Sequence, residues 1–266
     1  MDDRPVGIFD SGVGGLTSIN AFSEVLPHES IIYFGDTARA PYGTKSPRTV
    51  RAFSVEIADF LVCQGAKMLV AACNTTSATA LDAIRAKQPG MPVQGIIEPC
   101  AEKIAKECTA DNSIGIIATP VTVASKAYET NIHRLAPQLN VHAHACPAFV
   151  PLIESGAYEN GGMDETVRHT LDDFIRKNDI DTLVLGCTHY PIIRGVIEKL
   201  YPGITIIDPS YALAERVKAE LEQNRLTASE WPGRRTFYAS DLSQKFLAVI
   251  DLLGISGDYA LEQHRL

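Results

Sequence analysis

The chain has 266 residues, 45% of them hydrophobic, which is enough to bury a sizeable core in one large domain or two small ones. It carries 24 basic and 32 acidic residues, a formal charge of −8, and no Lys/Arg cluster longer than a pair such as Arg234-Arg235, which argues against nucleic acid as a main partner. The N-terminus is acidic where a signal peptide would be basic, and no apolar run approaches the roughly 18 residues that span a bilayer, so we expect a cytoplasmic protein without a membrane partner.

Apolar, β-branched runs alternate with helical patterns from one end of the chain to the other. A well-marked helix is expected over residues 47–63, with Ser46 as its N-cap, Pro47 at its first position and Gly65 just past its end. The alternation predicts an α/β fold in which helices cover parallel sheets. The expected strands are, in chain order, residues 6–9, 31–34, 67–72, 93–97, 113–118, 140–145, 181–186, 204–207 and 235–240.

A faint internal repeat divides this series of elements. LVAACN aligns on Cys73 with LVLGCT on Cys187, and each is followed by a strand expected to close on an acidic residue and a proline, at Pro99 and Pro209. Upstream, VGIFDS and IGIIAT align in the same order. The shared order predicts two similar α/β units rather than one continuous sheet.

The repeat also sets the expected domain boundaries. We expect two open parallel-sheet α/β domains related by a pseudo-twofold axis, with the active site in the cleft between them. The first comprises residues 1–97 and the second residues 98–207. Residues 208–266 hold two expected helices and one strand, too little for a sheet, and are expected to fold back onto the first domain.

Four loops follow expected strands and lead into expected helices: residues 10–15, 73–77, 118–122 and 187–189. Ligands of open parallel sheets bind beyond the carboxyl ends of the strands. The backbone N–H groups and dipole at a helix N-terminus suit a carboxylate or phosphate, and the same dipole lowers a cysteine's pKa from about 8.5 toward neutrality. We therefore expect the ligand site, and reactive thiolate, at these loops.

Cys73 and Cys187 stand at equivalent strand ends, and each is followed by hydroxyl or amide side chains. Although cysteine is often a buried packing residue, this repetition favours a functional pair. The other cysteines lack that context and are expected to be structural, and in a reducing cytoplasm all six are expected to be free thiols. These others are Cys63, Cys100, Cys108 and Cys146.

The loops that carry the glycines and the two cysteines could also suggest two kinds of cofactor site, but details of their sequence argue against both. GVGG with Asp36 22 residues after Gly14 is similar to a dinucleotide fingerprint, but Thr17 occupies the place of its third glycine. The cysteine pair and His189 could ligate zinc, but the chain has no C-x-x-C pair and no further clustered ligand set. We expect neither a bound dinucleotide nor a bound metal.

A pair of thiols, one from each half of the chain, suits inversion at a tetrahedral carbon. Such a reaction removes a proton from one face of the carbon and returns one to the other face. It needs two acid/base groups on opposite sides of the substrate, one ionised and one protonated. Two related domains would place Cys73 and Cys187 in that arrangement.

Six motifs between residues 9 and 191 now identify a family resemblance. In order they are FDSGVGGLT, GDTARAPYG, AACNTTSATA, ATPVTVAS, CPAFVPLIESG and LGCTHYP. They resemble the aspartate/glutamate racemase family, in its glutamate-specific branch, and no motif position departs from the family pattern. The resemblance implies an isomerase that interconverts L- and D-glutamate without pyridoxal phosphate or metal, supplies D-glutamate for peptidoglycan, and forms a homodimer.

The resemblance also implies roles for individual residues. Cys73 is the base that acts on D-glutamate and Cys187 the base that acts on L-glutamate, with Asp10, Glu154 and His189 as auxiliary acid/base residues. The implied substrate contacts are Asp10, Ser11, Tyr42, Gly43, Asn74, Thr75, Thr119, Thr122, Thr188 and His189. Most of them are neutral donors, which fits a net-negative protein that holds a dicarboxylate through local dipoles.

Three alternatives stay open at this point. A racemase for a related amino acid such as aspartate would need the same motifs, because one methylene changes the depth of a cavity rather than its chemistry. A non-enzymatic amino-acid-binding protein could use the same N–H groups but would give the paired cysteines no purpose. A redox pair of thiols would be revealed by counting free thiols before and after mild reduction.

Overall fold

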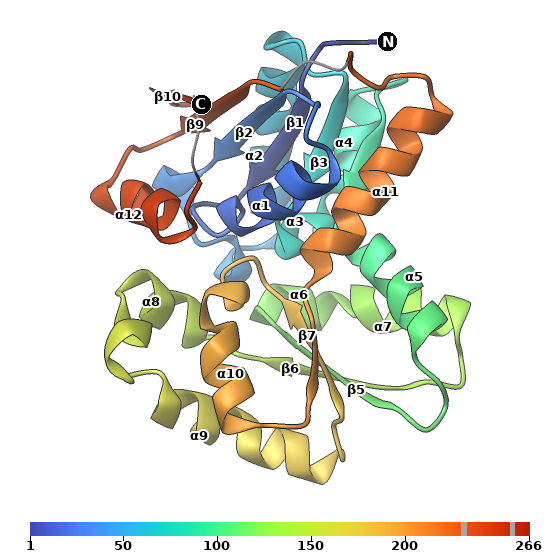
Figure 1. The fold of residues 1–266 in the computed structure, drawn as a ribbon, viewed down its shortest axis with the longest axis vertical. Coiled ribbons are helices and arrows are strands. Elements are labelled where there is room, and N and C mark those ends of the chain that lie inside the picture. The colour runs from blue at the N-terminus through green and yellow to red at the C-terminus, as the bar shows by residue number, and fades with distance from the viewer. Residues whose placement is uncertain (230–232, 256–258) are drawn as a thin grey trace.

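Two parallel β-sheets flanked by helices make up the fold, and Figure 1 shows them one above the other. The computed structural model describes residues 1–229, 233–255 and 259–266. Within these ranges the first sheet has the strand order β10-β9-β2-β1-β3-β4 and the second β6-β5-β7-β8, with every pair parallel. The strands of the first sheet are β1 (Val6–Asp10), β2 (Ile31–Gly35), β3 (Met68–Ala71), β4 (Val93–Gly95), β9 (Arg235–Ala239) and β10 (Tyr259–Gln263). Those of the second are β5 (Ser113–Ala118), β6 (Asn140–Ala145), β7 (Thr182–Gly186) and β8 (Thr205–Ile207).

The two sheets repeat one strand order, which confirms the predicted fold class of two similar parallel-sheet units. β1 lies between β2 and β3, with β4 beyond β3; β5 lies between β6 and β7, with β8 beyond β7. The strand before Cys73, β3, is therefore the counterpart of the strand before Cys187, β7. Equivalent positions in the two sheets thus carry the two cysteines.

Helix boundaries agree with the sequence prediction where the sequence has a clear N-cap residue. The predicted helix over residues 47–63 is confirmed as α2: the Ser46 hydroxyl accepts a hydrogen bond from the backbone N–H of Thr49, and Gly65 has a φ of +84° just past the end. None of the described helices is both long and apolar enough to cross a membrane. The α-helices are α1 (Leu16–Val25), α2 (Pro47–Cys63), α3 (Asn74–Thr79), α4 (Leu81–Lys87), α5 (Ile97–Glu107), α6 (Pro120–Ser125), α7 (Ala127–Leu135), α8 (Phe149–Glu154), α9 (Asp164–Lys177), α10 (Arg194–Leu200), α11 (Pro209–Gln223) and α12 (Gln244–Leu252). In the described part of the chain, the 3₁₀ helices between them are η1 (Thr37–Arg39), η2 (Tyr42–Thr44), η3 (Ala157–Asn160) and η4 (Tyr190–Ile193).

Two expectations about strands are wrong. The strand expected over residues 93–97 ends at Gly95, and Pro99 lies in the first turn of α5, where the missing N–H of proline costs no helical hydrogen bond. The segment after residue 208 holds two strands, not one: β9 pairs with β2, and β10 pairs with β9 at the sheet edge. β10 is mostly exposed, so its sequence carries no strong apolar signal.

Helices at the junction of the two sheets pack into one continuous core. α5 begins just after β4 and α11 just after β8; in Figure 1, α11 runs alongside the first sheet down to the junction of the two units, and α5 lies on the same side below it. α11 packs on α1 and α5, and α5 packs on α7. Apolar side chains from all four helices, including Leu16, Ile104, Ile132 and Leu213, belong to the same buried cluster. Burial of this shared apolar surface holds the two units together.

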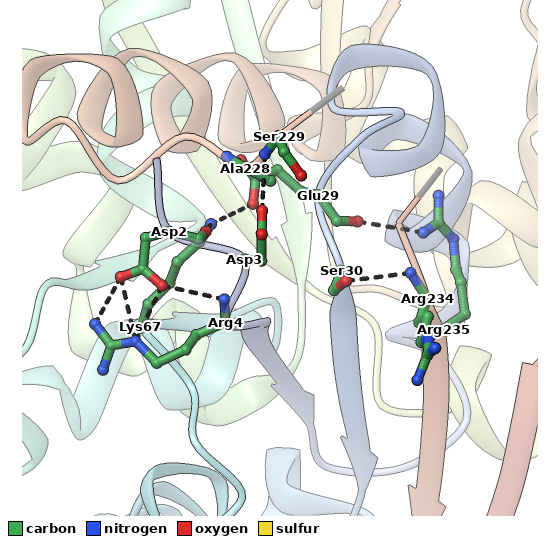
Figure 2. Close-up of polar contacts among 10 residues, drawn as sticks. All are labelled: Asp2, Asp3, Arg4, Glu29, Ser30, Lys67, Ala228, Ser229, Arg234 and Arg235. Carbon is green, nitrogen blue, oxygen red and sulfur yellow. Dashed lines mark hydrogen bonds and ion pairs between the residues drawn. The ribbon is translucent and has the colours of Figure 1, made fainter. Parts of the chain in front are cut away.

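At the amino ends of the strands of the first sheet, a buried ion pair joins three segments that are distant in the sequence (Figure 2). The ammonium group of Lys67, whose side chain is 0% exposed, lies 2.5 Å from a carboxylate oxygen of Glu29 and also donates to the backbone carbonyl of Asp2 at 2.6 Å. The other carboxylate oxygen of Glu29 accepts from the backbone N–H of Ala228 at 2.8 Å. The N-terminus, the loop before β2 and the chain before β9 are thereby joined at one buried charge pair.

Candidate active site

Both cysteines of the repeat lie at the carboxyl edges of their sheets and are nearly buried. Cys73 follows β3 and is the N-cap residue of α3, with 4% of its surface exposed. Cys187 follows β7 and is 6% exposed. All six cysteines are free, as predicted.

The surroundings of Cys73 keep it protonated. Burial and the negative charge of Asp10 raise the pKa of the Cys73 thiol to about 12, although hydrogen bonds from Thr76 and Ser11 work in the opposite direction. The predicted lowering of this pKa by a helix N-terminus is therefore wrong for Cys73. α3 has only six residues, so its dipole is weak against the loss of hydration. The site holds this sulfur as a thiol.

Cys187 heads a chain of acid/base groups. The Sγ atom of Cys187 lies 3.9 Å from Nδ1 of His189, and Nε2 of His189 lies 3.0 Å from a carboxylate oxygen of Glu154 at the end of α8. Burial opposes the charged imidazolium, but hydrogen bonds with Cys187 and Glu154, and the charge of Asp10, raise the pKa of His189 to about 10. A proton can pass along this chain between sulfur, imidazole and carboxylate.

Asp10 joins the two cysteine environments. One of its carboxylate oxygens accepts from the hydroxyl of Thr188 at 3.1 Å, and the other accepts from the backbone N–H of Gly12 at 2.9 Å. Burial raises the pKa of Asp10, although the charge of His189 and these donors oppose the change. A Cβ on Gly14 would come within 2.4 Å of His189, so only glycine allows this loop to lie directly on the second sheet's site. The carboxyl edges of the two sheets therefore face one another.

Three threonine hydroxyls form a second bridge between the units. The hydroxyl oxygen of Thr75 in α3 lies 3.0 Å from that of Thr119 and 3.3 Å from that of Thr122, and the latter two are 3.0 Å apart. Gly43 packs against the same group, because a Cβ there would lie 2.5 Å from Thr119. Next to Thr75, the amide oxygen of Asn74 accepts from the Tyr128 hydroxyl at 2.7 Å.

Asp36 belongs to this edge as well, although the sequence analysis gave it no role in the site. Its buried carboxylate follows β2 and accepts hydrogen bonds from the Tyr42 hydroxyl, from Nε of Arg39 at 2.7 Å and from the Ser240 hydroxyl at 2.9 Å. Burial and this carboxylate raise the pKa of Tyr42 far above its ordinary value, so the phenol remains a donor. Its place just after a strand was the signal that could have located Asp36. Tyr128 carried no such signal.

Every residue implied as a site residue therefore lies at or beside the facing edges of the two sheets. Val13 and Glu154 line two adjoining hollows there, each of about 270 Å³. One reaches α12 through Ala248 and Val249, and the other reaches Asp241 and Ser243. Within the described residues no group of three or more His, Cys, Asp or Glu side chains is arranged to hold a metal ion.

The imidazolium of His189 should make folding stability depend on pH. Because its pKa in the folded protein is raised to about 10 from 6.5, its contribution is complete below about pH 6.5 and is lost as the pH rises through about 10. Between these values the advantage of the wild type over His189→Asn in the free energy of unfolding should shrink by at most about 1.4 kcal/mol per pH unit. Urea unfolding at several pH values in this window measures it. His169→Asn, at an exposed position of α9, is the matched control, and an equal pH trend in both variants would contradict the assignment.

Comparison with known proteins agrees in sequence and in fold. The model of the Asp/Glu/hydantoin racemase family matches residues 17–217. The chain is 45% identical over 251 residues to the glutamate racemase of Neisseria meningitidis serogroup C / serotype 2a, covering 92% of this chain and 91% of that protein. It is 44% identical over 254 residues to the glutamate racemase of Geobacter metallireducens, covering 94% and 92% respectively. Among solved structures, that of glutamate racemase from Francisella tularensis subsp. tularensis SCHU S4 in complex with D-glutamate matches with a TM-score of 0.90 and 35% identity, covering 100% of this chain and 98% of that one.

Proposed function

The chain belongs to the Asp/Glu/hydantoin racemase family and is an isomerase, and from this premise we propose that it interconverts L- and D-glutamate by two-base proton transfer. One observation carries the proposal. Two nearly buried cysteines stand at equivalent strand ends of two facing sheets, and each has its own acid/base neighbours. A reaction that treats the two faces of one carbon alike needs that duplication.

The proposed reaction removes one proton from the α-carbon of glutamate and returns one proton to the opposite face of that carbon. In the L-to-D direction Cys187 takes the α-proton of L-glutamate, and the Cys73 thiol gives its proton to the opposite face of the carbanion. In the D-to-L direction the roles reverse. The pKa of about 12 keeps Cys73 protonated at neutral pH, which is the state required of the acid in the L-to-D direction.

The neighbouring groups are proposed to reset the thiols. His189, an imidazolium at neutral pH, can pass a proton from Nε2 to Glu154, 3.0 Å away, as its Nδ1 takes the proton that leaves Cys187. Asp10, with its raised pKa, can take the proton of Cys73 when D-glutamate is the substrate. Neither step requires a cofactor, because each proton moves between side chains of the site.

The remaining implied contacts are proposed to hold the two carboxylates and the ammonium group of the substrate. Ser11, Asn74, Thr188 and the three threonines Thr75, Thr119 and Thr122 offer neutral hydroxyl and amide groups, and Tyr42 and Gly43 shape the wall beside them. Neutral donors can bind a carboxylate without placing a permanent positive charge beside the reacting carbon. This supports the assignment of a dicarboxylate substrate.

The biological setting is proposed on the same basis. The protein would act in the cytoplasm as a homodimer and supply D-glutamate for peptidoglycan. We also propose domain boundaries of 1–97 plus 208–266 and 98–207, which is supported by the pairing of β9 with β2 of the first sheet.

Incubation of the purified protein with L-glutamate in deuterated water tests the proposal. We expect D-glutamate to appear with deuterium at its α-carbon, because the thiol that protonates the carbanion exchanges with solvent. Activity should persist after dialysis against a chelator and without pyridoxal phosphate. L-aspartate assayed in parallel separates the two substrates, since a shorter side chain is expected to react far more slowly. Faster turnover of aspartate, or label without inversion, would contradict the proposal.

A further inference from the structure

The side-chain amide of Asn74 has one end satisfied and the other unsatisfied. Its oxygen accepts from the Tyr128 hydroxyl at 2.7 Å. Its nitrogen Nδ2 is buried and has no hydrogen-bond partner among the described residues. A buried N–H group without an acceptor costs about 1–3 kcal/mol, and an incoming group that supplies an acceptor would remove this cost. Asn74 directly follows Cys73, at the edge where the substrate is proposed to bind.

The surroundings of Tyr128 hold its hydroxyl against the amide oxygen of Asn74. It lies in α7, 1% exposed, within the apolar core shared by the two units, so its ring has no freedom to move away. A phenol has a single proton, and this one is given to Asn74. The Cys100 thiol of α5 is a second polar neighbour of the same hydroxyl.

We propose that Tyr128 is a positioning residue for substrate binding: by occupying the oxygen of Asn74, it fixes the amide so that Nδ2 faces a carboxylate of the substrate. The inference rests on the proposed function for the identity of that carboxylate. Without the hydroxyl the amide can rotate by half a turn and present its oxygen, which repels a carboxylate. Tyr128 lies in α7 of the second unit and Asn74 in α3 of the first unit. The hydrogen bond between them therefore also couples substrate binding to the packing of the two units.

Tyr128→Phe tests the positioning role, since it removes one oxygen and keeps the ring. Asn74 would contact the carboxylate in the ground state and the transition state alike, so loss of its orientation should raise KM with little change in kcat. We expect KM for glutamate to rise about tenfold, in the range of one lost hydrogen bond, with kcat within about twofold of wild type. Tyr201→Phe is the matched control: it removes a hydroxyl bonded to Asp172, away from the site, and should leave both constants unchanged.

A double variant separates positioning from general damage to the fold. Asn74→Ala should raise KM at least as much as Tyr128→Phe does, and adding Tyr128→Phe to it should cause no further rise, because no amide remains to be oriented. An equal rise in both backgrounds would overturn the inference. So would a fall in kcat at unchanged KM in Tyr128→Phe alone.

A readout without substrate keeps this inference distinct from the proposed function. In ¹⁵N-edited NMR spectra the side-chain amide pair of Asn74 is identified as the pair missing from Asn74→Ala. That pair should shift or broaden in Tyr128→Phe and stay unchanged in Tyr201→Phe. If the wild type fails to racemise glutamate, the proposed function fails, and the spectra alone decide whether Tyr128 orients the amide. An unchanged Asn74 pair in Tyr128→Phe would overturn the inference even in an active racemase.

Discussion

Replacing either Cys73 or Cys187 with alanine is expected to lower glutamate racemisation in both directions by roughly 10³-fold or more, at the upper end of what one general acid/base group contributes. Each turnover needs both sulfurs, one to remove a proton and one to return it. The loss should appear in kcat for L-glutamate and for D-glutamate alike. Cys63→Ala, at an exposed position at the end of α2, is the matched control and should retain full activity.

The variants should keep half of the chemistry, and this identifies the face that each sulfur serves. A β-chlorinated glutamate can expel chloride from the carbanion, so elimination needs only the first proton transfer. Cys73→Ala, which retains Cys187, should eliminate from the L-isomer, and Cys187→Ala should eliminate from the D-isomer. The release of chloride measures both. Equal elimination from both enantiomers by both variants would point to a single base and would contradict the assignment of faces.

Replacing Lys67 with methionine is expected to destabilise the protein by about 3–5 kcal/mol, because it leaves the buried carboxylate of Glu29 without its ion partner. Methionine fills much of the volume of the lysine stem, so the lost charge dominates over lost packing. Figure 2 shows how much depends on this pair: Glu29 also holds the backbone at Ala228 and, through its own carbonyl, the Arg235 guanidinium. Urea unfolding followed by circular dichroism at neutral pH gives the free energy of unfolding.

A second variant distinguishes an uncompensated charge from a general loss of packing. Adding Glu29→Gln to Lys67→Met removes the stranded charge and should recover much of the lost stability. Lys177→Met breaks an ion pair with Asp173 whose two side chains are both largely exposed, and it should change stability by no more than about 0.5 kcal/mol. A double variant that is less stable than Lys67→Met alone would show that the pair is not the reason for the loss.

Local sequence determined most of the strands, the repeat and the positions of the two cysteines, but not the exposed edge strand β10. Apolar runs bounded by polar loops predict strands because each strand buries its own side chains, and the same run recurs before Cys73 and Cys187. Residues that bind beyond a strand follow it directly in the chain. Asp10 and His189 could therefore be located at strand ends from the sequence, although their partners could not.

Tertiary structure alone decided how these groups are charged and oriented. Cys73 is a thiol of raised pKa because burial and Asp10, far from it in the chain, outweigh the local effect of a helix N-terminus. Asp36 meets Ser240 across 204 positions and Asn74 meets Tyr128 across 54, and no local pattern encodes either contact. The hydration and hydrogen bonding of each side chain depend on the other groups around it. In this site those surroundings form only when the two sheets bring their carboxyl edges together.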